Sequence, residues 1–364
     1  LHINAFNFPC WGMLEKLGPT LLAGVPAIVK PASSTAYLTA KVFEAIIESN
    51  ILPDGAVQLI CGSTGDLMDH LNCQDVVAFT GSKNTADHLR QHRNIIAQSV
   101  RFTAETDSLN ASILGPDAKP GTPEFDLYVK EIVREMTVKA GQKCTAIRRI
   151  IAPESLVVDL ADALSARLAK IKLGHPALEE TGMGTLASLD QRKEVRMRVE
   201  ELSAENEIVF GDLEKFEVIG ADKERGAFFA PILLQCKNPL SAESVHSIEA
   251  FGPVSTIIPY SSIENAVALA NRGEGSLVGS VFTYDNETSK HLALGIAPYH
   301  GRVLLMNRDC AKESTGHGSP LPHLVHGGPG RAGGGEELGG IRGVLHYMQR
   351  IAVQGSPAAV ETLA

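Results

Sequence analysis

The chain has 364 residues, of which 44% are hydrophobic and 21% charged, and its formal net charge is −9. These values are typical of a globular protein, and the length favours two domains over one. The negative charge argues against nucleic acid or an anionic membrane as the main partner. No apolar run approaches the roughly 18 residues of a membrane span, and the first 25 residues lack the basic start of a signal peptide. Six cysteines without zinc-ligand spacing favour reduced thiols, as in a cytoplasmic protein.

The first part of the chain alternates between strand-like and helix-like runs. It starts at Leu1, without a methionine, in what reads as the middle of a strand (LHINAF), so we expect a piece of a longer protein whose N-terminal part is missing. Such alternation predicts a parallel α/β sheet. The expected strands are 1–6, 25–29, 57–61 and 76–79, and the expected helices are 12–22, 36–49, capped by the hydroxyls of 33–35, and 83–93. Ligands of such sheets bind beyond the carboxyl ends of the strands, where Asn7, Lys30 and Ser82 lie.

A second α/β unit begins at about residue 110, after which Pro and Gly residues form a turn-rich stretch. We therefore expect a cofactor domain over 1–109, a catalytic domain over 110–340, and a C-terminal strand and tail over 341–364. The alternating run 345–353 has no local partner and is predicted to add to another sheet, possibly in a partner subunit. The expected helices are 124–140, 154–171, 188–205, 262–272 and 287–296, and the expected strands are 147–152, 254–258, 277–283 and 302–306.

Cys144 lies where a helix-like run stops, at Gly141, and a strand-like run (IRRIIA) is about to begin. A thiol on such a turn can face a cleft, and its thiolate could attack an electrophilic carbon. The alternative is a buried structural cysteine, since free cysteine is among the most buried residue types.

Two further segments could bind a dinucleotide. Thr80, Gly81 and Ser82 follow an apolar strand and open a helix, which suits a pyrophosphate, although Ser82 could equally be a plain N-cap. Lys30 ends another strand and could hold a ribose or phosphate, or remain solvated. Ser33 leaves that site without negative charge and so tolerates a 2′-phosphate, which favours NADP over NAD.

Other polar residues are less distinctive. Glu105 follows an apolar segment and could be a general base for water, or a surface glutamate. The string GPGRAG (328–333) neither follows a predicted strand nor opens a helix, so it fails the context test for a dinucleotide fingerprint and is read as a loop. His317, His323 and His326 lie in the same segment without ligand spacing, so no metal site is expected.

Six motifs occur together and in order: NFP with Trp11, GVPAIVKPA, FTGS, Glu105, GQKC and EAFGPV. In this combination the chain resembles the aldehyde dehydrogenase superfamily along nearly its whole length. The stretches KEIVREMTVKAGQKCTAIRR and HGGPGRAGGGEELGG are similar to a branch that acts on CoA-bound semialdehydes in aerobic degradation of aromatic compounds such as phenylacetate and benzoate. Some members of that branch carry a fused hydratase, and full-length members are expected to be homo-oligomers.

The resemblance implies a role for each matching residue. Cys144 would be the nucleophile, Glu105 the base, and Asn7 with the backbone N–H of Cys144 the oxyanion hole. The implied cofactor contacts are Lys30 and Ser33 at the adenosine ribose and its phosphate, Thr80, Gly81 and Ser82 at the pyrophosphate, and Glu249 with Phe251 at the nicotinamide ribose. Around the base, the family's Glu-Leu-Gly-Gly is replaced by Glu-Thr-Asp-Ser, and the base-to-thiol interval of 144 − 105 = 39 residues is lengthened by the loop 115–123.

The implied activity is NADP-dependent oxidation of a CoA-bound semialdehyde to the acid through a cysteine thiohemiacetal and an acyl-enzyme. A free aldehyde as substrate, or NAD as cofactor, remains open. So do a CoA-acylating enzyme, which the glutamate at position 105 disfavours, and a truncated chain that keeps the fold without turnover.

Overall fold

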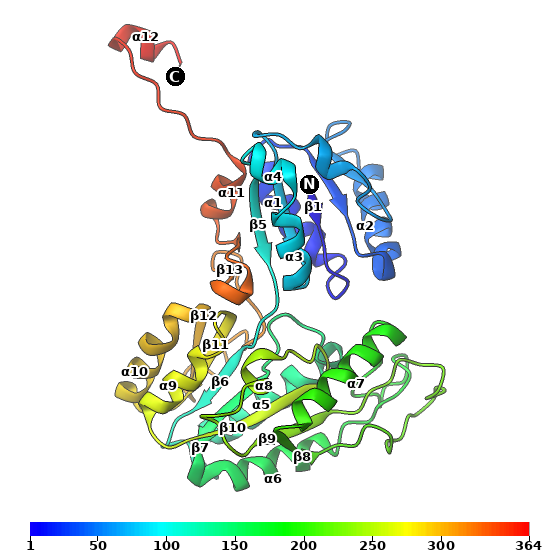
Figure 1. Cartoon of the computed structure of the whole chain (residues 1–364), viewed down its shortest axis with the longest axis vertical. Helices are drawn as coiled ribbons and strands as arrows, with labels where there is room; N and C mark the ends of the chain where they lie inside the picture. The colour runs from blue at the N-terminus through cyan, green and yellow to red at the C-terminus, as the bar shows by residue number, and fades with distance from the viewer. Residues whose placement is uncertain (364) are drawn as a thin grey trace.

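The computed structural model describes residues 1–363, which form two lobes built around separate β-sheets (Figure 1). The first lobe contains a parallel five-stranded sheet in the order β3-β2-β1-β4-β5. Its strands are β1 (His2–Ile3), β2 (Ala27–Lys30), β3 (Val57–Leu59), β4 (Val76–Thr80) and β5 (Arg101–Glu105). The register pairs Ile3 with Lys30 and Thr80 with Glu105, so these strands end at one edge of the sheet.

Both faces of this sheet are covered, which explains its continuous apolar strands. Val77 and Phe79 of β4 pack toward α3 and α4, whereas Val76 and Ala78 pack against Tyr347. On another part of the sheet, α1 and α2 bury Val29 and its neighbours. The helices of this lobe are α1 (Trp11–Leu22), α2 (Ala36–Glu48), α3 (Lys83–Arg90) and α4 (Arg93–Ala97), with short 3-10 turns at Ser33–Thr35 and Leu67–His70.

The second lobe contains a seven-stranded sheet in the order β12-β11-β6-β7-β10-β9-β8, in which only the β8–β9 pair is antiparallel among the described strands. Its strands are β6 (Ala111–Leu114), β7 (Arg149–Pro153), β8 (Asn206–Phe210), β9 (Ile232–Cys236), β10 (Val254–Tyr260), β11 (Ser276–Phe282) and β12 (His300–Met306).

Neighbouring residues of these strands face opposite layers. Ile150 lies in the core under α5 and α6, and Ile151 lies in the core under α9 and α10. The sheet is therefore buried on both sides, as parallel sheets usually are. The helices are α5 (Pro123–Thr137), α6 (Val157–Leu168), α7 (Leu189–Ser203), α8 (Ser244–Ser247), α9 (Ile263–Asn271) and α10 (Asn286–Ile296), with 3-10 turns at Val138–Gly141, Glu154–Leu156 and Ala297–Tyr299.

After β12 the chain returns to the first lobe (Figure 1). The antiparallel strands β13 (Val325–Gly327) and β14 (Glu336–Leu338) are joined through a 3-10 turn at Gly330–Ala332. β14 lies beside β5 and α1, and β13 lies beside β11 and β12. Gly335 N donates to Ala104 O at 2.9 Å, and Thr106 N donates to Ala332 O at 3.0 Å. Some residues of the range 110–340, expected from the sequence to form a separate domain, thus pack on the first lobe.

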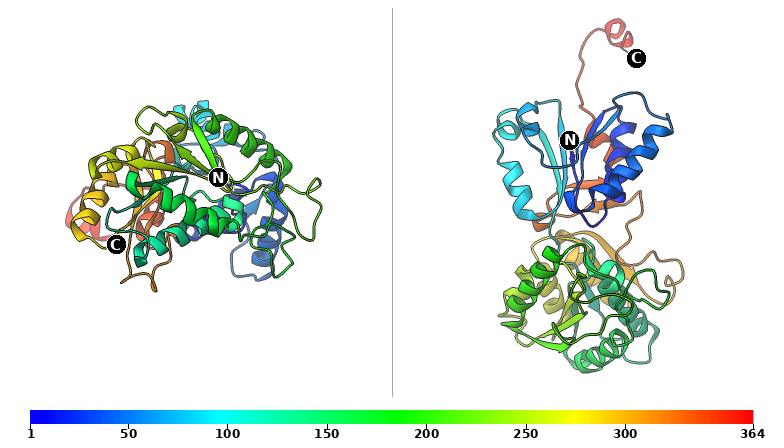
Figure 2. Two further views of the ribbon diagram at one scale, coloured as in Figure 1. Left: turned by 90° about the horizontal axis from the view of Figure 1, so that it is seen from below. Right: turned by 90° about the vertical axis from the view of Figure 1, so that its right-hand side faces the viewer.

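The strand expected over 345–353 does not form. Instead α11 (Ile341–Tyr347) packs beside α1, and residues 348–356 have no regular structure before α12 (Pro357–Glu361), which extends away from both lobes (Figure 2). Gly343 and Tyr347 are buried four residues apart, which is helical spacing, and Arg101 Nη1 donates to His346 O at 2.9 Å. These contacts favour a helix over the strand that alternation predicted.

The other expected elements occur within a few residues of their predicted bounds. The side-chain cap that the hydroxyls of 33–35 were expected to provide for α2 does not form. Those residues form the 3-10 turn, and the Thr35 hydroxyl donates to Phe6 O at 3.0 Å instead of capping α2. All six cysteines are free. Among residues 1–363, no helix has the length and apolar character needed to cross a membrane.

Candidate active site

Cys144 lies in a turn between α5 and β7 and borders a cavity of about 390 Å³ between the two lobes. The cavity is also lined by Asn7, Glu105 and His326, and its mouth by Trp11 and Lys139. The thiol is only partly exposed. Burial, and after it the neighbouring Glu105 carboxylate, raise the pKa of the Cys144 thiol. The resting group is therefore a thiol that needs a proton acceptor before it can act as a nucleophile.

The turn before Cys144 has an unusual backbone. Lys139, Ala140 and Gly141 have φ values of 54°, 51° and 68°, which L side chains rarely adopt. Any other residue at position 141 would force the backbone to move, because its Cβ would lie 2.2 Å from Gly252 O. Three consecutive left-handed residues reverse the chain sharply, and this turn leads directly to the thiol.

Two buried side chains hold that turn. Arg148 donates to Gly141 O at 2.9 Å and to Gly252 O at 2.7 Å. Asn110 Nδ2 donates to Cys144 O at 2.8 Å, while Asn110 Oδ1 accepts from Val278 N of β11. The position of Cys144 is therefore fixed by hydrogen bonds from the central strands of the second sheet.

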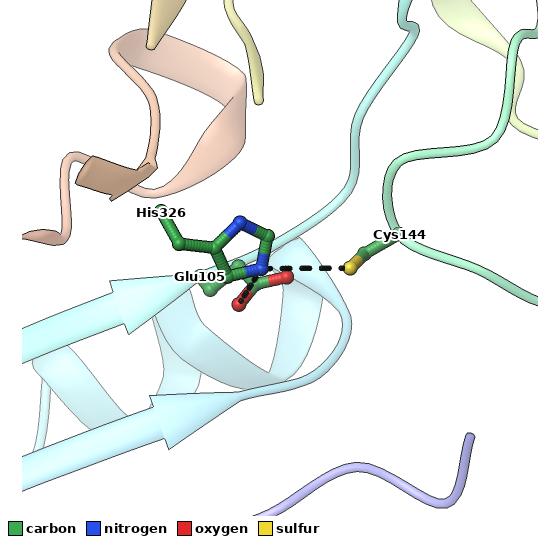
Figure 3. Close-up of side chains that lie close together, drawn as sticks. All are labelled: Glu105, Cys144 and His326. Carbon is green, nitrogen blue, oxygen red and sulfur yellow. Dashed lines mark hydrogen bonds and ion pairs between the residues drawn. The ribbon is translucent and has the colours of Figure 1, made fainter. Parts of the chain in front are cut away.

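Glu105 ends β5, and its carboxylate faces Cys144 across the lobe boundary (Figure 3). Its Oε2 lies 3.2 Å from Nε2 of His326, which in turn lies 3.8 Å from Cys144 Sγ. Burial alone would raise the pKa of Glu105, but His326 and then Lys16 outweigh it and lower that pKa to about 2. Burial would lower the pKa of His326, but Glu105 raises it to about 9. The pair is thus a carboxylate and an imidazolium beside the thiol.

A second buried charged group lies behind Glu105. Lys16 of α1 donates to Thr80 Oγ1 at 2.7 Å and to Glu337 Oε2 of β14 at 3.0 Å, and lies 3.5 Å from Glu15 Oε1. Burial opposes the charge on Lys16, but Glu337, Glu15 and Glu105 raise its pKa. Burial is also the main cause that raises the pKa of Glu337 to about 8. Oxygens of Glu15, Glu105 and Glu337 lie within 4.8 Å of one another.

Asn7 approaches the catalytic turn from the first lobe. Its side chain is 8% exposed, and Nδ2 donates to Gln142 O at 3.3 Å, two residues before Cys144. Within residues 1–363, the N–H of Cys144 has no acceptor. The structure thus brings together the three residues that the sequence predicted for catalysis, Cys144, Glu105 and Asn7, around one cavity.

The predicted residues for the adenosine half of a cofactor lie at the carboxyl edge of the first sheet. Lys30 ends β2, and Ser33 is exposed just beyond it. Thr80 ends β4, and its hydroxyl accepts from Lys16. Gly81 N donates to Glu105 O, and Ser82 caps α3 by accepting from Thr85 N at 3.3 Å. Ser82 is therefore an N-cap, whatever else it binds.

Glu249 is already engaged within the protein. Its Oε1 accepts from Arg148 Nε at 3.2 Å, and its Oε2 accepts from Ser108 N at 3.0 Å. Burial raises the pKa of Glu249 to about 7, although Arg148 opposes this. Phe251 packs edge-on against Phe6, with ring centroids 5.8 Å apart. In this structure Glu249 braces the Cys144 turn through Arg148.

Sequence reasoning missed His326, Lys16 and Glu337 as members of the site. His326 was noted, but as part of a histidine-rich loop, and it lies 182 residues from Cys144 in sequence. Lys16 lies on α1 and Glu337 on β14, and no local sequence motif marks either of them as part of a site. Only the return of the C-terminal segment to the first lobe places them here.

Comparisons with known proteins agree with this arrangement. The model of the aldehyde dehydrogenase family matches residues 1–353. Over 329 residues the chain is 50% identical to 3,4-dehydroadipyl-CoA semialdehyde dehydrogenase of Aromatoleum evansii, covering 90% of this chain and 64% of that protein. It is also 50% identical over 182 residues to Protein MaoC of Klebsiella aerogenes, covering 50% of this chain and 52% of that protein. The chain thus spans less than two thirds of either relative.

A solved structure shows the same fold. The crystal structure of betaine aldehyde dehydrogenase from Staphylococcus aureus in complex with NAD⁺ superimposes with a TM-score of 0.83 at 28% identity, over 95% of this chain and 65% of that chain. With a family match over almost all its residues and a cysteine, a glutamate and an asparagine around one cavity, the chain belongs to the aldehyde dehydrogenase family.

Proposed function

We propose that this chain carries the catalytic machinery for the NADP-dependent oxidation of a CoA-bound semialdehyde to the carboxylic acid. The observation that carries the proposal is the meeting of Cys144, Glu105 and Asn7 at one cavity, from both lobes. The substrate class is supported by the 50% identity to a protein named 3,4-dehydroadipyl-CoA semialdehyde dehydrogenase. By the same likeness, the pathway would be the degradation of an aromatic compound.

The first step is the attack of Cys144 on the aldehyde carbon. The thiol proton passes to the Glu105 carboxylate, the Sγ–carbon bond forms, and the carbonyl oxygen becomes an oxyanion. Asn7 Nδ2 and the free N–H of Cys144 donate to that oxygen. Removing one such donor typically raises the barrier by about 3 kcal/mol.

The residues at the sheet edge fit a dinucleotide, because Lys30 supplies a cation near exposed Ser33 and the positive end of α3 begins just beyond Ser82, although the N–H of Lys83 there already donates to Asp107 Oδ1. When bound, the nicotinamide cofactor accepts the hydride from the thiohemiacetal carbon, which leaves a thioester on Cys144. Lys30 and Ser33, without a carboxylate between them, suit the 2′-phosphate of NADP. NAD, which is bound in the betaine aldehyde dehydrogenase structure, is the alternative.

Hydrolysis of the thioester releases the acid. Glu105 orients a water whose oxygen attacks the acyl carbon, the carbon–sulfur bond breaks, and the thiolate of Cys144 is restored. Because His326 and Lys16 hold the pKa of Glu105 low, this carboxylate retains a proton poorly. The proton that Glu105 takes from the attacking water therefore passes on to solvent in the cavity, since Glu337, with its pKa raised to about 8, is already mostly protonated at neutral pH. General-base help of this kind contributes roughly 10²–10⁴-fold.

We also infer that the natural protein is a cytoplasmic homo-oligomer that works with a fused or separate hydratase. The six free cysteines support a reducing compartment. The resemblance of two stretches, 130–149 and 326–340, to a branch with fused hydratases supports the hydratase.

The proposal is tested by incubating the chain with NADP⁺ or NAD⁺ and a panel of free and CoA-linked semialdehydes. The expected result is NADP⁺ reduction, fastest with a CoA-linked semialdehyde, with a carboxylic acid as product. With free CoA added to the same assay, a new thioester formed at the former aldehyde carbon would instead identify a CoA-acylating enzyme. Cys144→Ala should lose at least about 10³-fold in rate while still binding NADP⁺, because the nucleophile is gone. Cys310→Ala, a free thiol away from the cavity, is the matched control and should keep full activity.

A further inference from the structure

The cluster of Cys144, Glu105 and His326 combines a thiol, a carboxylate and an imidazole (Figure 3). One donor atom from each residue lies within 4.8 Å of the other two. These three ligand types together suit Zn²⁺, whereas Mg²⁺ and Ca²⁺ require oxygen ligands. The oxidation proposed above uses these groups without any metal, so an ion here would have a different role.

The spacing of the donor atoms already approximates a tetrahedral zinc site. Zinc lies about 2.3 Å from a cysteine sulfur and about 2.1 Å from an imidazole nitrogen or a carboxylate oxygen. At tetrahedral angles these lengths place sulfur and nitrogen about 3.6 Å apart, and nitrogen and oxygen about 3.4 Å apart. The observed distances are 3.8 Å from Cys144 Sγ to His326 Nε2 and 3.2 Å from His326 Nε2 to Glu105 Oε2. Both distances lie within a few tenths of an ångström of the tetrahedral values, and the third, from Cys144 Sγ to a Glu105 oxygen, is at most 4.8 Å.

The charge balance of the cluster also fits a divalent cation. Glu105 and His326 are 2% and 6% exposed, so an uncompensated charge there would be costly. Zinc binding would release one proton from the His326 imidazolium and one from the Cys144 thiol, and the resulting thiolate, carboxylate and neutral imidazole would together neutralise one Zn²⁺. Moreover, Glu105 Oε1 is buried without a hydrogen-bond partner in the described part of the chain, and such an orphaned oxygen requires an explanation.

An ion can reach this cluster because all three residues line the same open cavity. The cavity also leaves room for a water as fourth ligand, which is the usual arrangement when a protein supplies three. The site would therefore bind and release zinc without unfolding.

From these observations we propose that Cys144, Glu105 and His326 form a reversible inhibitory site for a single zinc ion. The ion occupies the nucleophile and the base at once and so stops aldehyde oxidation. The inhibition rests on the proposed function, but zinc binding does not. The proposal departs from the expectation, drawn from the sequence, that the chain carries no metal.

The test uses the chain with Cys61→Ser and Cys73→Ser, which removes the two exposed thiols that could bind zinc nonspecifically. After chelator treatment, Zn²⁺ alone is titrated by calorimetry, and labelling of Cys144 by iodoacetamide is followed by mass spectrometry. We expect one zinc per chain, protection of Cys144 by zinc, and no protection by Mg²⁺. His326→Phe and His326→Asn should each weaken zinc binding at least about 100-fold, because changes to residues that merely support a ligand cost about 10–100-fold.

His323→Ala, an exposed histidine on the same segment, is the matched control and should bind zinc normally. Circular dichroism verifies that each variant is folded. Zinc binding that persists unchanged in folded His326→Phe, or zinc that leaves Cys144 labelling unaltered, overturns the proposal. If zinc binds and protects Cys144 but no aldehyde is oxidised by the metal-free chain, the site stands and the proposed function fails. If the chain oxidises the aldehyde but binds no zinc, the proposed function stands and the zinc site is refuted.

Discussion

At the scale of single residues, the position of the thiol depends on groups that never touch the substrate. Arg148 and Asn110 hold the carbonyl groups on either side of Cys144, and Gly141 permits the close approach of Gly252. These contacts support a backbone conformation that costs about 1–2 kcal/mol for each non-glycine residue. The Cys144 thiol is thus positioned by a strained backbone segment, and the buried hydrogen bonds offset the cost of that strain.

Gly141→Ala should therefore reduce both stability and activity. The new Cβ would meet Gly252 O at 2.2 Å, and the φ of 68° is unfavourable for alanine. We expect a loss of about 2–4 kcal/mol in unfolding free energy, the range for an overpacked and strained position, and a lower kcat because Cys144 moves. Gly184→Ala is the control: apart from its chain neighbours nothing lies within 4 Å of its Cβ, and its φ is not in the left-handed region, so stability should change by less than about 0.5 kcal/mol. Chemical denaturation of both variants measures the difference, and equal stabilities would contradict the account.

At the scale of elements, the site is assembled where β4, β5, α1 and the β13–β14 pair converge. The sequence predicted β4 and α1, because apolar runs and helical spacing are local signals. It did not predict β5 as a strand and noted only an apolar segment before Glu105. It also predicted the turn at Cys144 from the change of pattern around Gly141. It could not place His326, because its position depends on contacts between distant segments: β13 pairs with β14 and packs on β11 and β12, while β14 packs on the first lobe. The same long-range packing made the terminal strand prediction wrong, since Tyr347 is buried as part of a helix.

Lys16 of α1 forms an ion pair with Glu337 of β14, so replacing Lys16 should lower the free energy of unfolding. Lys16→Met would leave Glu15, Glu105 and Glu337 buried together without their cation. Breaking a buried ion pair in this way typically costs about 3–5 kcal/mol. Lys41→Met, on the exposed face of α2 beside Glu44, removes a surface pair and should change stability by about 0–1 kcal/mol. The midpoints of urea unfolding measure both changes. A Lys16→Met protein as stable as Lys41→Met would show that the ion pair has no structural importance.

At the scale of the whole molecule, the second lobe buries several neutral imidazoles that make stability depend on pH. Burial, as the largest cause, lowers the pKa of His300 to about 4 and that of His246 to about 3. The unfolded chain has an ordinary histidine pKa near 6.5 and therefore binds protons first as the pH falls. The stability is fully present above about pH 6.5 and declines as the pH drops toward the folded pKa values. Each such group contributes up to about 1.4 kcal/mol per pH unit.

His300→Gln should flatten this decline. In the natural chain we expect the unfolding free energy to fall steadily between pH 6.5 and pH 4. In the variant one titrating group is lost, so the slope of this fall should be smaller by about 1 kcal/mol per pH unit. His291→Gln, which removes an exposed histidine from α10, should leave the slope unchanged. Urea unfolding at a series of pH values gives the slopes. An identical slope in all three proteins would show that His300 is protonated without cost in the fold.

The central claim is that Cys144 forms a covalent bond to the aldehyde carbon and that Glu105 is needed to release the acid. Glu105→Gln removes the base and keeps the shape, so the acyl group should accumulate on the enzyme. The variant would be mixed with NADP⁺ and the best semialdehyde, quenched in acid, digested, and analysed by mass spectrometry. The account predicts one equivalent of NADPH in a burst and an acyl adduct on the peptide that contains Cys144. Steady turnover without an adduct, or an adduct on another residue, would contradict it.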